Sequence, residues 1–187
     1  MHSLLSRYPA VMRLGEGTAS QDADTDVTEV TSWRHITRGS LRRESQAMLG
    51  EINQVPPMYS AIKVGGKKLY ELARDGKEVE RKARPVIIHE FELFTSDGGA
   101  DDDLRSEDQL QTPDVRFTVG CSKGTYVRTL AFDLGRAVGS VAHLTALRRT
   151  HVGEFSVDDA WDVHELTDAL TAIAAEAPKR KSASRGN

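Results

Sequence analysis

The sequence predicts an α+β fold built as a mixed, mainly antiparallel sheet flanked by helices. Two segments with alternating apolar residues, 84–94 and 114–121, have the period of strands that bury one face. Residues 126–138 instead repeat apolar side chains every four positions, which is typical of a helix packed on a core. With 187 residues, the chain is long enough for one compact domain, or for one domain with a subdomain.

Four elements are predicted before residue 84. They are a strand over 8–18 that ends in a glycine-containing turn, a modest surface helix over 37–50, a loop or sheet edge over 52–66, and a short helix over 68–76. Gly50 and Gly76 are suitable helix stops. Pro56 and Pro57 remove backbone donors, and this favours a loop or an edge over a central strand.

The two alternating segments predict the central strands. One face of the first is expected to carry Ile87, His89, Phe91 and Leu93, and one face of the second Val115, Phe117, Val119 and Cys121. Between them, residues 96–113 contain six acidic residues and one arginine, a composition typical of a solvated hairpin loop.

The C-terminal third predicts a helix, a strand and a second helix. The first helix buries Tyr126, Leu130, Leu134 and Val138, and a strand is expected over 143–155. An amphipathic helix with Leu166, Leu170 and Ile173 on one face then ends before Pro178. Residues 178–187 are expected to form a basic, disordered tail.

The composition argues against several kinds of site. The one cysteine, Cys121, excludes a disulfide framework and a multi-cysteine zinc site, and it is expected to be a buried structural thiol. The six histidines show no metal-ligand spacing, and the acidic run Asp22, Asp24 and Asp26 lacks the glycine and glutamate of a calcium loop. No long apolar run or secretory signal is evident, so a cytoplasmic protein is expected.

Charge is segregated along the chain. Residues 63–84 contain eight basic and four acidic groups, a net charge of +4, whereas residues 96–113 carry −5. The chain has a net charge of −3, so without the acidic loop it carries +2, and a basic surface is available for phosphates. Mixed charge on solvated faces is the alternative, and charge by itself does not decide between them.

Three segments resemble the bacterial TruB family, the tRNA pseudouridine-55 synthases. They are VPPMYSAIKVGGKKLYELARDGKEVERKARPV (55–86), CSKGTYVRTLAFDLG (121–135) and HLTALRRTHVGEF (143–155), in the family's order. The resemblance implies the pseudouridine synthase fold and a cofactor-free, metal-free isomerisation of a uridine flipped out of the tRNA T loop. It also implies that residues 63–84 form an RNA-binding thumb for the T arm, with Lys67 and Lys68 contacting RNA, and we expect a monomer.

The resemblance assigns roles to four further residues. Tyr126 matches the active-site tyrosine near the target base, and Arg128 matches the arginine that pairs with the catalytic aspartate. Tyr8 matches an aromatic residue that stacks on the flipped uracil, and Leu147 matches an apolar wall of the pocket. Without the family, a core Tyr126, a surface-paired Arg128 and an ordinary strand Tyr8 would be the simpler interpretations.

One family segment is missing from the sequence. The nucleophilic aspartate of the family lies in a G-H-T-G-A-L-D-P-like stretch, which does not occur here, and Asp22, Asp24 and Asp26 belong to a later loop. Residues 1–177 are therefore expected to be a partial catalytic domain, incomplete at the N-terminus and inactive alone. The alternatives are a non-catalytic tRNA-binding or RNA-remodelling protein on the same scaffold, and an unrelated acidic protein with an incidental basic strip.

Overall fold

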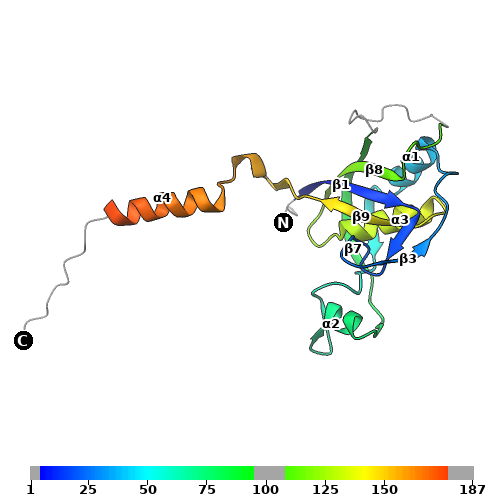
Figure 1. The fold of residues 1–187 in the computed structure, drawn as a ribbon, viewed down its shortest axis with the longest axis horizontal. Coiled ribbons are helices and arrows are strands. Elements are labelled where there is room, and N and C mark those ends of the chain that lie inside the picture. Colours follow the sequence, from blue (N-terminus) through cyan, green and yellow to red (C-terminus); the bar gives the residue numbers. More distant parts are fainter. Residues whose placement is uncertain (1–4, 95–107, 177–187) are drawn as a thin grey trace, which may run out of the picture.

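A seven-stranded sheet organises the structure, a computed structural model that describes residues 5–94 and 108–176 (Figure 1). The strand order is β11 (Phe155–Ser156), β10 (His151–Val152), β1 (Ser6–Leu14), β8 (Asp114–Cys121), β7 (Arg84–Phe94) and β4 (Gly50–Gln54), and β9 (Ala142–Leu147) pairs with β1. These strand pairs are all antiparallel, and an isolated bridge between Asp22 and Leu144 is parallel. The mainly antiparallel sheet is thus confirmed.

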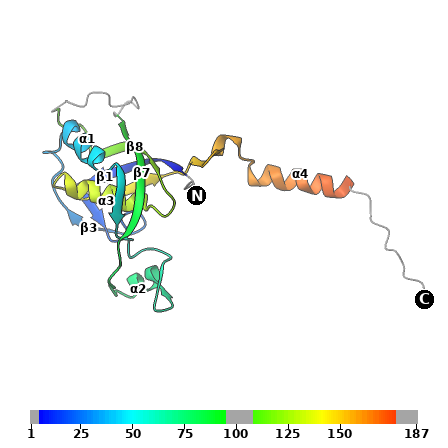
Figure 2. The ribbon, with the colours of Figure 1, turned by 180° about the vertical axis from the view of Figure 1, so that it is seen from behind.

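Two helices pack on one face of this sheet, as Figure 2 shows from behind: α1 (Arg38–Ala47) and α3 (Val127–Ala137). The four-residue spacing predicted α3, and Leu130 and Leu134 are fully buried. Tyr126 and Val138 were also expected in the core, but they are the cap residues at the two ends of the helix and are only half-buried.

The predicted helix over 37–50 is α1. It begins after Thr37, whose side chain accepts a hydrogen bond from the Ser40 amide, and it contributes Leu41 to the core.

The alternation in β8 is confirmed, since Val115, Phe117, Val119 and Cys121 are all buried. The predicted face of β7 is wrong in its first half. Val86 and Ile88 are buried there, whereas Ile87 and His89 are exposed. The register to β8 shifts between Ile88 and Glu90, and such a bulge exchanges the two faces of the strand. Phe91 and Leu93 therefore return to the core.

The single strand predicted over 143–155 is also wrong. After β9 ends at Leu147, the Arg148 and Thr150 amides still donate to the carbonyls of Pro9 and Arg7 in β1. The chain then forms the hairpin β10–β11, which reverses at Gly153 with φ +60°. The left-handed turn suits glycine, and it reverses the chain within the segment that the apolar pattern suggested was one strand.

The region before residue 84 holds two smaller pieces. A hairpin of β2 (Glu16–Thr18) and β3 (Val27–Val30) continues from β1 through Gly15, where the predicted turn lies. The thumb contains β5 (Lys63–Val64), β6 (Lys67–Lys68) and α2 (Leu69–Arg74), and it projects away from the sheet (Figure 1). As expected, β4 before it is a sheet edge, and Gln54 in β4 is the register partner of Arg84 in β7.

The predicted C-terminal helix is confirmed as α4 (Val163–Glu176), which extends away from the sheet (Figure 1). Its apolar residues Leu166, Leu170 and Ile173 are exposed. None of the helices in the described ranges is long and apolar enough to cross a membrane. Most of the acidic loop over 96–113, and the tail over 178–187, lie outside the described residues.

Candidate functional site

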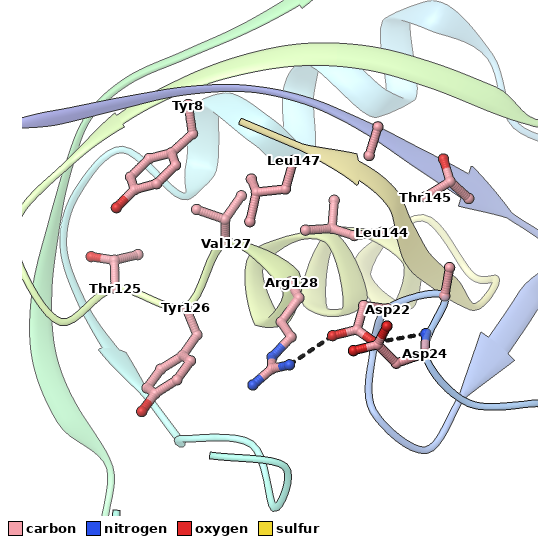
Figure 3. A pocket seen from close by; sticks show the side chains of 12 residues that line it. Tyr8, Asp22, Asp24, Thr125, Tyr126, Val127, Arg128, Leu144, Thr145 and Leu147 are labelled. Carbon is pink, nitrogen blue, oxygen red and sulfur yellow. Dashed lines mark hydrogen bonds and ion pairs between the residues drawn. The ribbon is translucent and has the colours of Figure 1, made fainter. Parts of the chain in front are cut away.

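A cavity of about 410 Å³ opens where the first turn of α3 meets β1, β9 and the loop after β2 (Figure 3). Tyr8, Tyr126, Arg128 and Leu147 all line it, although they lie far apart in the sequence. The structure thus brings together four of the six predicted site residues. Lys67 and Lys68 do not line this cavity, because they belong to the thumb.

The start of α3 presents several consecutive residues to the cavity. Gly124, with φ +86°, turns the chain after β8, and Tyr126 then occupies the N-cap position in an extended conformation, with φ −94° and ψ 104°. Because the helix begins only after this residue, Tyr126, Val127 and Arg128 all line the cavity (Figure 3). The positive end of the helix dipole also points here, which favours negative charge.

The opposite wall comes from the sheet. Tyr8 in β1 is half-buried and packs against the core, while Leu147 at the end of β9 is 50% exposed. In Figure 3, Leu144 and Leu147 lie along one side, and the rings of Tyr8 and Tyr126 lie at the same end of the cavity. Two aromatic rings beside an apolar wall are the surroundings that suit a flat base.

Arg128 is held by two acceptors. Its Nη1 donates to Oδ2 of Asp22 at 2.7 Å, and its Nη2 donates to the backbone carbonyl of Tyr59. The side chains of Arg128 and Asp22 are only 22% and 21% exposed. Burial would raise the pKa of the Asp22 carboxyl, but hydrogen bonds from Ser20, the Asp24 amide and Arg128 outweigh it, so the pKa lies below its ordinary value. Asp22 is therefore ionised at neutral pH.

The backbone before Asp22 is strained. Gln21 has φ +64°, an unusual value for a residue other than glycine. Its side-chain Oε1 accepts from the Thr129 hydroxyl at 2.8 Å, and its carbonyl accepts from the Leu144 amide at 3.0 Å. Because these bonds tie Gln21 to both α3 and β9, they fix the direction in which the Asp22 carboxylate points.

The pairing of Asp22 with Arg128 was not predicted from the sequence, where Asp22 was rejected both as a calcium ligand and as a nucleophile. The two residues are separated by 106 positions, so no local spacing links them. The available signal was the position of Asp22 in a loop that resembles the family pattern.

A second cavity, of about 490 Å³, lies farther along α3, and Thr129, Phe132 and Asp133 contribute to its lining. Arg81, near the end of the thumb, also lines it. Burial raises the pKa of Asp133 to about 6. The ionised form is thus disfavoured in the folded protein relative to the unfolded chain.

Asp133→Asn is expected to raise the free energy of unfolding at pH 7 by about 2 kcal/mol. The shift of the pKa from 3.8 to about 6 corresponds to about 3 kcal/mol, and solvent screening at this partly exposed carboxyl reduces it. The folded protein binds a proton more tightly here, so the wild type gains stability as the pH falls from about 7 to about 4. The difference between variant and wild type should disappear over this range, as followed by urea unfolding at several pH values. The exposed Asp26→Asn is the control, and equal pH profiles for wild type and Asp133→Asn would contradict the assignment.

Comparison with known sequences identifies the family. Residues 1–127 match the family model of the TruB family pseudouridylate synthase (N terminal domain), which is more than half of the chain. The chain belongs to the TruB family. Residues 128–182 match the tRNA pseudouridylate synthase B C-terminal domain. This confirms the resemblance found in the sequence.

Curated members of the TruB family are similar over most of this chain. The tRNA pseudouridine synthase B of Aromatoleum aromaticum is 48% identical over 169 residues, which are 90% of this chain and 49% of that protein. The protein of the same name from Parabacteroides distasonis is 41% identical over 163 residues, covering 87% of this chain and 63% of the relative. The chain spans about half the length of most of the curated relatives it matches.

Solved structures support the same fold. A chain of a Cbf5-Nop10-Gar1 complex superposes with a TM-score of 0.56 at 24% identity, covering 89% of this chain and 36% of that one. A chain of an H/ACA RNP bound to a substrate RNA containing 2'-deoxyuridine gives a TM-score of 0.55 at 20% identity, covering 94% and 37%. The TruB chain therefore has the pseudouridine synthase fold, as predicted.

Proposed function

We propose that this chain forms the RNA-binding and base-holding part of a tRNA pseudouridine-55 synthase, which acts in the cytoplasm as a monomer. The enzyme breaks the N-glycosidic bond of an everted T-loop uridine, rotates the base and rejoins it through C5. The observation that carries the proposal is the convergence of Tyr8, Tyr126, Arg128 and Leu147 on one cavity in a TruB family chain.

The aromatic and apolar residues of the cavity are proposed to hold the uracil. Everting a base costs a few kcal/mol, and stacking on an aromatic ring returns about 1–3 kcal/mol per base, so two rings can offset most of the cost. Tyr8 stacks on the base, Leu147 closes the apolar wall, and Tyr126 lies near C5, where a proton has to leave. Val127, which is buried, helps to exclude water from this end of the cavity.

Arg128 is proposed to keep a carboxylate oriented and ionised beside the base, because a guanidinium presents its donors in a fixed plane. Asp22 is its partner here. We propose that the reacting carboxylate comes from a segment outside residues 1–187, since no stretch of this sequence resembles G-H-T-G-A-L-D-P. This absence also favours the second candidate, a non-catalytic tRNA-binding protein on the same scaffold.

The thumb is proposed to clasp the phosphates of the T arm. Lys67 is exposed, and the Lys68 and Arg74 cations lie 5.3 Å and 5.4 Å from the ring centre of Tyr70, so positive charge gathers around this ring. Removing both lysines by Lys67→Ala and Lys68→Ala is expected to weaken T-arm RNA binding. The slope of log K against log salt concentration should also fall by about 1.5, because each lost phosphate contact releases one counterion fewer.

The salt titration needs a variant that removes charge elsewhere. Arg43 is exposed on α1, away from the thumb. Arg43→Ala should therefore leave the salt dependence of RNA binding unchanged. A double lysine variant with the wild-type salt slope would remove the thumb from the RNA-binding surface.

The function itself is tested by incubating the purified chain with unmodified T-arm RNA and mapping pseudouridine. Pseudouridine at the T-loop uridine supports catalysis by this chain. Saturable binding without pseudouridine supports the non-catalytic alternative or a carboxylate supplied from outside, and adding the upstream segment of a relative separates these two. Absence of saturable binding would overturn the proposal.

A further inference from the structure

Gln54, the last residue of β4, has a side chain that the site described so far does not use. It is 3% exposed, and its carboxamide makes two hydrogen bonds to the backbone of Tyr126. The Tyr126 amide donates to Oε1 of Gln54 at 2.8 Å, and Nε2 of Gln54 donates to the Tyr126 carbonyl at 3.1 Å. The Gln54 carboxamide thus makes a pair of hydrogen bonds with the Tyr126 backbone, one accepted and one donated, as two paired residues of neighbouring antiparallel strands do.

These two bonds act at the residue where the loop after β8 passes into α3. Tyr126 precedes the first turn of α3 in an extended conformation, and its own side chain makes no capping bond. Its amide is among the groups that the helix itself leaves without a partner. The Tyr126 carbonyl also accepts from the Thr129 and Leu130 amides of α3, so the helix itself helps to hold this side of the residue. Gln54 adds the bond to the amide, and the two sides together fix the direction in which the tyrosine ring leaves the backbone.

The segment that follows Gln54 binds Arg128, a second residue that lines the cavity. The Tyr59 carbonyl, five positions after Gln54, accepts a hydrogen bond from Arg128. Between them, Pro56 and Pro57 are buried and stiffen the connection. Residues 54–59 therefore hold both Tyr126 and Arg128, and the same chain continues directly into the thumb at Lys63.

We propose that Gln54 is a positioning residue of the uridine site, whose carboxamide sets the Tyr126 ring against the everted base. This inference rests on the proposed function for the identity of the base. Gln54 does not touch the base itself, because it does not line the cavity and reaches it only through the backbone of Tyr126. An error of about 1 Å in the position of a catalytic group can cost about 100-fold in rate, so such a contact matters for turnover more than for binding.

Two variants test the inference in the whole chain. Gln54→Glu has the same shape, but its ionised form cannot donate to the Tyr126 carbonyl, so its effect should grow as the pH rises. Gln54→Met fills the space without either bond. Gln46→Glu, on the exposed side of α1, makes the same change of charge away from the cavity and serves as the control. Thermal unfolding identifies any variant that fails to fold, and Gln54→Met remains informative if the buried glutamate does not fold.

Three kinds of measurement test the variants: amide hydrogen exchange, fluorine NMR, and the rate and affinity with RNA. Amide hydrogen exchange of Tyr126 should accelerate about fivefold in Gln54→Met, since one hydrogen bond of this kind is worth on the order of 1 kcal/mol. The fluorine resonance of 3-fluorotyrosine at position 126 should shift in both variants, and its change on adding an unmodified T-arm hairpin should be smaller than in the wild type. Where pseudouridine forms, the single-turnover rate should fall about 100-fold, with RNA affinity within about threefold of the wild type.

The outcomes separate this inference from the proposed function. Unchanged amide exchange and an unchanged fluorine resonance in the Gln54 variants overturn the positioning role, regardless of their RNA affinity or their rate of pseudouridine formation. If the fluorine resonance at position 126 of the otherwise wild-type protein does not shift when the T-arm hairpin is added, the proposed uridine site itself is overturned. An equal loss of RNA affinity and rate would also contradict positioning, because it would make Gln54 a binding or folding residue.

Discussion

Arg128→Lys should lower the rate of pseudouridine formation about 100-fold while leaving the affinity for T-arm RNA within about threefold of the wild type. Lysine keeps the positive charge, but a single ammonium cannot reproduce the planar fork that reaches Asp22 and the Tyr59 carbonyl together. The reacting carboxylate, which Arg128 is proposed to orient beside the base, then loses its fixed orientation. Single-turnover assays in the enzyme form that contains the reacting carboxylate measure the rate, and filter binding measures the affinity.

The same helix offers a matched control for this substitution. Arg136 donates from Nη1 and Nη2 to the two carboxylate oxygens of Glu29, at 3.1 and 2.7 Å, and both side chains are more than 40% exposed. Arg136→Lys should therefore leave turnover unchanged, because an exposed ion pair contributes little and does not line the cavity. Wild-type turnover in Arg128→Lys would remove Arg128 from the mechanism.

Gly135→Ala should lower the free energy of unfolding by about 2–3 kcal/mol. A Cβ at this position of α3 would lie 2.7 Å from both the Cβ and the backbone nitrogen of Ala142, and 2.9 Å from the carbonyl carbon of Val141. These are mostly backbone atoms of β9 and the residue before it, so only a displacement of α3 can relieve the contact. Alanine improves helix propensity by about 1 kcal/mol, which the collision outweighs. A thermal melt should show a decrease of roughly 4–10 °C.

Gly120→Ala is the comparison for this prediction. Its Cβ would meet only the Glu90 side chain, with the nearest atom, Cγ, at 2.9 Å. A flexible side chain can move away, so the stability should change by less than about 1 kcal/mol. If both glycine variants unfold at the wild-type temperature, the close approach of α3 to β9 is not required for stability.

The fold could be predicted where one face of an element is buried along its whole length. The alternation in β8 was sufficient for this reason, and so was the spacing of Leu130 and Leu134 in α3. Tyr126 and Val138, at the two ends of that helix, are only half-buried.

Such patterns failed where the backbone departs from regularity. The bulge near His89 exchanges the faces of β7, and the turn at Gly153 divides the predicted strand over 143–155. Neither departure changes the average apolar pattern enough to be visible in the sequence.

The candidate site was predictable to the extent that single residues matched a family pattern. Tyr8, Tyr126, Arg128 and Leu147 were found in this way, and the structure places all four on one cavity. Polar contacts between distant segments were not predictable. The Asp22–Arg128 pair spans 106 positions and the Gln54–Tyr126 contact spans 72, and periodicity carries no information on such pairs.

The pairing of Gln54 with Arg84 has a consequence for how the molecule can vary. The chain leaves the sheet at Gln54 and re-enters it at Arg84, which is its register partner. Residues 55–83 between them therefore form an insertion that could be shortened or exchanged without altering the strand order. Both ends of this segment are tied to the rest of the structure, since the Tyr59 carbonyl accepts from Arg128 and Arg81 lines the second cavity beside α3. If the thumb binds RNA as proposed, the residues between these two ends can vary without changing the cavity that is proposed to hold the base.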